Sequence, residues 1–141
     1  MNISSAAQAH VNYGALTGKG QLSGDQAYAQ SKLAIMMWSF YLAEQLGDTG
    51  PVVVAVNVAS MLASKMVKDA YVVDENDLGI GADILVRASL SDDFANASGR
   101  YFDNDRREFT KPHPDALDTS KYRKLVTAIE AVAAELGVKI S

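Results

Sequence analysis

The sequence predicts an α/β protein whose single domain, residues 1–141, holds a parallel sheet of about three strands with flanking helices. Two observations support this prediction. The chain has the length of one ordinary domain, and 48% of its residues are hydrophobic, which is enough to fill a core. Short β-branched stretches also alternate with longer helix-forming stretches, an order typical of right-handed crossovers between parallel strands.

The first half of the chain predicts two strands and one long helix. Residues 1–4 have the character of the end of a strand whose beginning is absent, and a polar, glycine-containing loop follows over 5–23. Good helix formers then run from 25 to 46, with an acidic residue at the positive end of the helix dipole and a glycine after the last turn. The continuous β-branched stretch 51–57 predicts a strand buried on both faces.

The second half predicts helices over 61–71 and 77–90 and a short strand over 100–103. Residues 106–114 are charged and contain prolines, so we predict a loop there. An amphipathic helix that ends at Gly137 follows. Its apolar residues recur at helical spacing and are Tyr122, Leu125, Val126, Ile129, Val132, Ala133 and Leu136.

The helix over 25–46 is apolar around most of its circumference between Leu33 and Leu42. A helix on one face of a sheet normally leaves a polar stripe toward water. Either this helix packs a second face against another subunit or an absent segment, or it is the central helix of a larger domain. The outer edge of the first strand would also carry unpaired backbone groups. We therefore expect a homo-oligomer, through the Leu33–Leu42 face or that edge, or a rearranged fold.

Composition excludes several classes of function. A net charge of −4 does not indicate a surface that binds nucleic acid or an anionic membrane. The absence of cysteine excludes disulfides and thiolate chemistry. His10 and His113 are far apart in the sequence, so we predict no metal site. The longest apolar stretch is too short to span a bilayer, and no signal-peptide pattern is present. We expect a soluble, cytoplasmic protein.

Residues that could carry chemistry lie near the expected carboxyl edge of the sheet. Tyr28 and Lys32 are four residues apart, which places both on one face of the long helix. A nearby ammonium favours the phenolate form that acid/base chemistry uses, although this spacing alone is common. Ser4 and Ser5 follow the first strand, and the chain over 57–67 leaves the next strand at the same edge, where ligands of open α/β sheets bind.

Taken in this order, the motifs resemble the C-terminal, active-site half of the short-chain dehydrogenase/reductase family, and most of all its retinol-dehydrogenase-like members. The motifs are Ile-Ser-Ser-Ala-Ala at 3–7, Tyr-Ala-Gln-Ser-Lys at 28–32, the stretch 56–67 and Gly-Arg-Tyr-Phe at 99–102. The resemblance covers essentially the whole chain. It implies a partial Rossmann-like fold without its N-terminal nucleotide-binding half. It also implies hydride transfer between NAD or NADP and a small alcohol or carbonyl substrate.

The resemblance implies a role for each matching residue. Tyr28 would be the general acid/base, and Lys32 would stabilise its phenolate and contact the nicotinamide ribose. Ser5 would polarise the substrate carbonyl, with Ser4 as the fallback. Ser64 would touch the nicotinamide carboxamide or the phosphates, and it could equally be a helix N-cap. The cofactor contacts are thus expected at Tyr28, Lys32 and Ser64. For the serines of the first strand, strand-end capping is the structural alternative.

Three departures from the family pattern bear on activity. The Gly-rich turn that binds pyrophosphate would precede Ser5, and the glycines over 17–24 lie after it and follow no strand, so they predict a flexible substrate-side loop. The family's catalytic asparagine would also lie upstream. Val58-Ala59 replaces the usual Pro-Gly, which predicts a distorted cofactor pocket. We therefore expect that the chain alone does not turn over substrate.

Three interpretations remain open on the sequence alone. The first is the active-site segment of an NAD(P)-dependent oxidoreductase. The second is a non-catalytic oligomerising remnant or interaction module of that family. In the third, the chain is a structural α/β domain in which Tyr28 and Lys32 are incidental.

Overall fold

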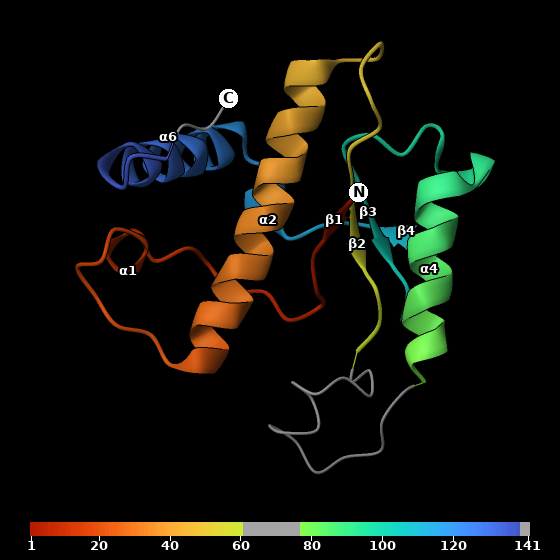
Figure 1. The fold of residues 1–141 in the computed structure, drawn as a ribbon, viewed down its shortest axis with the longest axis horizontal. Helices are drawn as coiled ribbons and strands as arrows, with labels where there is room; N and C mark the ends of the chain where they lie inside the picture. The colour runs from red at the N-terminus through yellow and green to blue at the C-terminus, as the bar shows by residue number, and fades with distance from the viewer. Residues whose placement is uncertain (61–76, 139–141) are drawn as a thin grey trace.

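The computed structural model describes residues 1–60 and 77–138. The predicted helix over 61–71 and Ser64 lie outside the described residues. In chain order the elements are β1 (Asn2–Ile3), α1 (Tyr13–Leu16), α2 (Gly24–Leu46), β2 (Val54–Asn57), α4 (Leu78–Leu90), the 3-10 turn η1 (Asp92–Phe94), β3 (Arg100–Asp103), β4 (Glu108–Thr110), α5 (Pro114–Leu117) and α6 (Thr119–Glu135) (Figure 1).

The strands form one mixed sheet in the order β1-β2-β3-β4, so the fold is α/β as predicted. β1 pairs with β2 and β2 with β3 in parallel, and β4 pairs antiparallel with β3. The three parallel strands of the prediction are confirmed, although β2 begins at Val54 and not at Pro51. Because these strands are parallel, their carboxyl ends at Ile3, Asn57 and Asp103 meet at one edge of the sheet.

The fourth strand corrects the prediction of a loop over 106–114. Arg107 takes a left-handed φ of 57°, which turns the chain back so that Glu108 pairs with Asp103. Phe109 then packs beside Phe102 and Phe94, with ring centroids 5.1 and 5.2 Å away. One aromatic side chain thus anchors a strand in a segment whose charge predicts exposure.

Helices cover both faces of the sheet, and Figure 1 shows the strands between α2 and α4. β2 is buried along its whole length, as its apolar stretch predicts, and its side chains alternate between two cores. Ala55 faces a core that it shares with α2, α5 and α6. Val54 and Val56 face the second core, which includes Ile84 of helix α4.

Helix α2 lies at the centre of the molecule. Its N-terminus carries a capping box in which Ser23 and Gln26 bond each other's backbone N–H groups, and it ends before Gly47. Leu33 is fully buried in the core that α2 shares with β2 and β3, and Leu125 of α6 belongs to the same core. The sheet and α6 therefore cover two sides of the apolar helix.

The short helix α1 lies within the segment predicted as a loop over 5–23, and α5 begins at the last residue of the loop predicted over 106–114. Helix α6 begins at Thr119, three residues before the first apolar residue of the predicted periodic pattern, Tyr122. Asp118 caps α6 by accepting hydrogen bonds from the N–H groups of Ser120 and Lys121. Among the described residues, no helix combines the length and the apolar character needed to cross a bilayer.

Candidate functional site

The two serines after β1 have different surroundings. Ser4 is 2% exposed; its N–H donates to the Val56 carbonyl at 2.8 Å and its hydroxyl donates to the Lys32 carbonyl at 3.0 Å. Ser4 therefore joins β1 to both β2 and α2. The half-buried Ser5 accepts a hydrogen bond from the Ala7 N–H at 3.1 Å, and in the described part of the chain its hydroxyl proton has no acceptor. Of the two hydroxyl groups, that of Ser5 is the one able to donate to a ligand.

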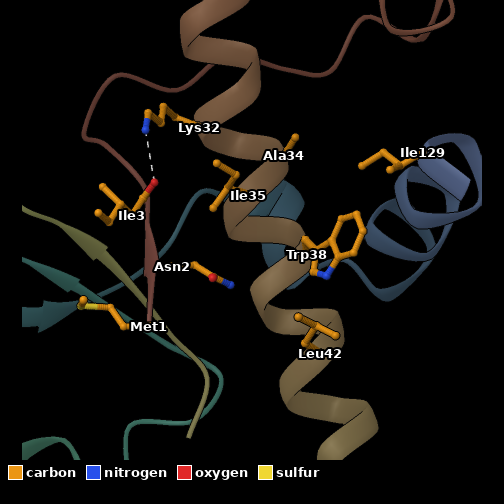
Figure 2. Close-up of a pocket in the computed structure, with 9 residues that line it drawn as sticks. All are labelled: Met1, Asn2, Ile3, Lys32, Ala34, Ile35, Trp38, Leu42 and Ile129. Carbon is orange, nitrogen blue, oxygen red and sulfur yellow. Dashed lines mark hydrogen bonds between the residues drawn. The ribbon is translucent and has the colours of Figure 1, made fainter. Parts of the chain in front are cut away.

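Lys32 reaches from α2 to the end of β1. Its Nζ donates to the Ile3 carbonyl at 3.2 Å, the bond drawn in Figure 2. The Ser4 N–H of the same peptide unit points toward β2, so the Ile3 carbonyl points to the open side of the sheet. Lys32 thus satisfies an outward carbonyl of the edge strand from within the chain, and the ammonium is held at the carboxyl edge of the sheet.

Tyr28 lies beside this ammonium. The Lys32 Nζ is 5.4 Å from the centroid of the Tyr28 ring, within the range of a cation–π contact, so the two side chains share a helix face as the spacing predicts. The Tyr28 carbonyl accepts a bond from the Ser31 hydroxyl, whereas the Tyr28 hydroxyl has no hydrogen-bond partner among residues 1–60 and 77–138. A phenol hydroxyl and an ammonium are therefore available together at this edge.

A polar network lies where β2 and β3 end. The Asn57 side-chain amide, 2% exposed, donates to Asp103 Oδ1 and to Asp105 Oδ2, each at 2.9 Å. The Ser60 N–H and hydroxyl donate to the two oxygens of Asp105, at 2.9 and 2.6 Å. Burial raises the pKa of the Asp105 carboxyl, but the bonds from Ser60 and Asn57 outweigh burial and hold that pKa below its ordinary value.

The segment Val58-Ala59, where the resemblance predicts Pro-Gly, follows directly from β2. Neither residue takes a positive φ, since Arg107 is the single described non-glycine residue that does. The Val58 carbonyl accepts a bond from the Asn104 side chain at 2.7 Å, and the Asn104 N–H donates to the Asn57 carbonyl at 3.1 Å. Ordinary backbone angles and hydrogen bonds thus hold this turn, and it carries no backbone strain.

The glycines over 17–24 lie in the segment that runs from the end of helix α1 to the first residue of helix α2. The first turn of α2 is capped by its own Ser23 and Gln26 side chains. The described residues therefore contain no glycine-rich turn from a strand into a helix that would hold a dinucleotide's phosphates. At the carboxyl edge of the sheet, Lys32 and Tyr28 offer hydrogen-bond donors.

A cluster around Asp115 is absent from the sequence prediction. His10 Nδ1 lies 2.6 Å from one Asp115 oxygen, Lys121 binds the other oxygen, and the His113 ring contacts the His10 ring edge to face at 4.9 Å. Burial raises the pKa of the Asp115 carboxyl, but bonds from Lys121 and His10 lower it below its ordinary value. No local pattern signals this contact, because His10 and Asp115 are 105 positions apart.

The same cluster brings together ligand atoms of His10, His113 and Asp115 within 4.8 Å, although the two histidines are distant in the sequence. The His113 Nδ1 lone pair accepts the Asp115 N–H at 3.2 Å, and both Asp115 oxygens are occupied by His10 and Lys121. These groups satisfy one another in the geometry observed. Their effect is to tie the loop that follows Ser5 to helices α5 and α6.

An open groove of about 550 Å³ runs along the free side of β1 and α2 (Figure 2). It is lined by apolar side chains from both elements and from α6, with Lys32 at one end. The lining residues are Met1, Asn2, Ile3, Lys32, Ala34, Ile35, Trp38, Leu42 and Ile129. This groove is the part of the apolar α2 surface that neither the sheet nor α6 covers.

Comparison with known proteins gives no family assignment, because no family model, curated protein or solved structure matches the chain.

Proposed function

We propose that this chain carries the proton-exchanging residues of an NAD(P)-dependent oxidoreductase that acts on a small alcohol or carbonyl, in a partial Rossmann-like fold of the short-chain dehydrogenase/reductase type. One observation carries the proposal. The Lys32 ammonium, bound to the Ile3 carbonyl, lies 5.4 Å from the Tyr28 ring at the carboxyl edge of a parallel sheet. Ligands of open α/β sheets bind at this edge.

Each residue has a distinct part in the proposed reaction. In the reducing direction the Tyr28 hydroxyl gives its proton to the substrate oxygen and becomes a phenolate, which the positive charge of Lys32 stabilises. The Ser5 hydroxyl donates a hydrogen bond to the same oxygen and stabilises the charge that develops there. When bound, the nicotinamide supplies the hydride that adds to the carbonyl carbon. In the oxidising direction these transfers are reversed.

The cofactor contacts follow from the same residues. Lys32 carries three N–H donors, of which the Ile3 carbonyl occupies one, so further donors remain for ribose hydroxyl groups. Tyr28 adds a hydroxyl on the same helix face, and Ser64 is the third proposed contact. The phosphates need a different partner, either another segment or another polypeptide. As part of the same proposal, we place the protein in the cytoplasm.

The test is a calorimetric titration of the chain with NADH and with NADPH, followed by a dehydrogenase assay. The variant Tyr28→Phe removes one hydroxyl and is expected to abolish any turnover, and to weaken cofactor affinity by no more than about tenfold, the cost of one lost hydrogen bond. Tyr41→Phe is the matched control in the same helix and is expected to retain turnover. Flat titrations with both cofactors would overturn the proposal for the chain on its own.

The groove along β1 and α2 favours a second candidate, a non-catalytic module that associates with a second copy of the chain. Ile3 and Ile35 remain 42% and 37% exposed there, and an apolar groove beside a strand edge is a surface that association can bury. Light scattering at micromolar concentration tests it. Ile35→Asp should reduce any association, whereas Val86→Asp, on the far helix α4, should not. Tyr28→Phe should leave association unchanged.

A further inference from the structure

The Asp105 carboxylate binds Ser60 where the chain leaves β2. Asp105 accepts the Ser60 N–H on Oδ1 at 2.9 Å and the Ser60 hydroxyl on Oδ2 at 2.6 Å. One residue therefore fixes both the backbone and the side chain of Ser60. Hydrogen bonds to an ionised acceptor are shorter and stronger than bonds between neutral groups, so this contact restrains the turn although both residues are exposed.

Asp105 is itself held from the interior. Its Oδ2 accepts a bond from the Asn57 amide at 2.9 Å, and its N–H donates to Asp103 Oδ1 at 3.1 Å. Asn57 and Asp103 are 2% and 8% exposed, so the network has a buried base at the ends of β2 and β3. The position of the Asp105 carboxylate is thus set by the sheet.

The turn between these fixed points has no conformational restriction of its own. Val58 and Ala59 replace a Pro-Gly pair, and they lack both the fixed φ of proline and the close approach that glycine permits. Hydrogen bonds from the Asn104 side chain to the Val58 carbonyl and from Ser60 to Asp105 lie on either side of Ala59. Side-chain contacts therefore supply the restriction that residue type does not.

We propose that Asp105 is a positioning residue of the site at the carboxyl edge: it holds Ser60, and through Ser60 it fixes the path of Val58–Ser60 where the chain passes the nicotinamide end of the cofactor. This inference rests on the proposed oxidoreductase function. Asp105 acts through Ser60 in this proposal, because its oxygens bind Ser60 and Asn57.

The experiment combines amide hydrogen exchange with cofactor titration on the whole chain. Asp105→Asn keeps the shape of the side chain and removes its charge, and is expected to speed exchange of the Ser60 amide about tenfold and to weaken NADH binding about tenfold. Asp93→Asn is the matched control. It removes a carboxylate in η1 whose Oδ2 lies 3.8 Å from the Arg87 guanidinium. It should change neither quantity.

A double-mutant cycle with Ser60→Ala identifies the route of the effect. If Asp105 acts through Ser60, the losses in NADH affinity of Asp105→Asn and Ser60→Ala are less than additive in the double variant. Additive losses would overturn that route. Ser60→Ala also keeps the test informative if Asp105→Asn does not fold, because it removes the hydroxyl bond to Asp105 and leaves the bonds of Asp105 to Asn57 and Asp103 in place.

The outcomes separate this inference from the function on which it rests. Unchanged Ser60 exchange in Asp105→Asn would overturn the contact itself, whatever the cofactor does. Faster exchange with unchanged NADH affinity would overturn the positioning role and leave a purely structural one. A wild-type chain that binds neither NADH nor NADPH overturns the proposed function for the chain on its own and with it the positioning role, while the exchange data still decide whether Asp105 holds Ser60.

Discussion

The Lys32 ammonium donates a hydrogen bond to the Ile3 carbonyl at 3.2 Å, and this contact joins the helix that carries Tyr28 to the strand that precedes Ser5. It connects residues 29 positions apart and has two consequences. It satisfies a backbone carbonyl at the open edge of the sheet, and it holds a positive charge near the Tyr28 ring. Stability and the proposed chemistry therefore depend on the same side chain.

Replacing Lys32 should affect these two properties to different degrees. Lys32→Met keeps most of the aliphatic stem but loses the bond to Ile3, so we expect the free energy of unfolding to fall by about 1 kcal/mol. Any dehydrogenase activity should be lost, because no positive charge remains to stabilise a Tyr28 phenolate. Urea unfolding and a turnover assay measure the two effects. Lys19→Met, at an exposed loop position, is the control and should change neither.

Alanine variants of the two serines after β1 should differ in stability and in turnover in the same assays. Ser4→Ala removes a buried hydroxyl that donates to the Lys32 carbonyl, and the unfolding free energy should fall by about 1 kcal/mol. Ser5→Ala removes a hydroxyl that accepts only a local bond from Ala7, so its stability should change by less than about 0.5 kcal/mol while turnover falls. A larger loss of stability from Ser5→Ala than from Ser4→Ala would contradict the assignment of the two roles.

Short-range patterns in the sequence account for most of the fold. The buried strand β2 and the long helix α2 each carry a local signal of several residues, and both form close to the predicted bounds. The loop predicted over 106–114 was wrong because strand β4 depends on Phe109 meeting Phe102 across a turn, which charged neighbours conceal. The short helices α1 and α5 contain only one turn each, too few residues for a periodic pattern.

The candidate site likewise contains one contact that the sequence predicts and several that it does not. Tyr28 and Lys32 lie on one helix, so their spacing alone predicts their proximity. Contacts between distant segments, such as Lys32 with Ile3 or Asp105 with Ser60, depend on strand register and loop path, and no local pattern contains them. The contact of His10 with Asp115 is of this kind, and it explains why two histidines far apart in the sequence become neighbours.

The Asp115 cluster should make stability depend on pH in the acidic range. The folded-state pKa of Asp115 lies below its ordinary value, so its ionisation stabilises the fold above about pH 4, and this contribution is lost as the pH falls through the folded pKa. Asp115→Asn should therefore be less stable than wild type at pH 6, and the difference should shrink toward pH 2. Urea unfolding across this range measures it. Asp48→Asn, at an exposed position, controls for the general effect of one charge, and a pH-independent difference would contradict this account.

Strand β4 should depend on Phe109 more than on its backbone pairing with β3. Phe109 contacts the Phe94 and Phe102 rings. The Arg100 guanidinium lies over the Phe109 ring, 4.0 Å from the ring centroid. Phe109→Ala removes these contacts at a partly buried position, so we expect the free energy of unfolding to fall by about 2 kcal/mol, less than at a fully buried phenylalanine. Thr110→Ala, the next residue in the same strand, should cost less than about 0.5 kcal/mol. Equal losses from the two variants would mean that backbone pairing, and not the aromatic cluster, holds the strand in place.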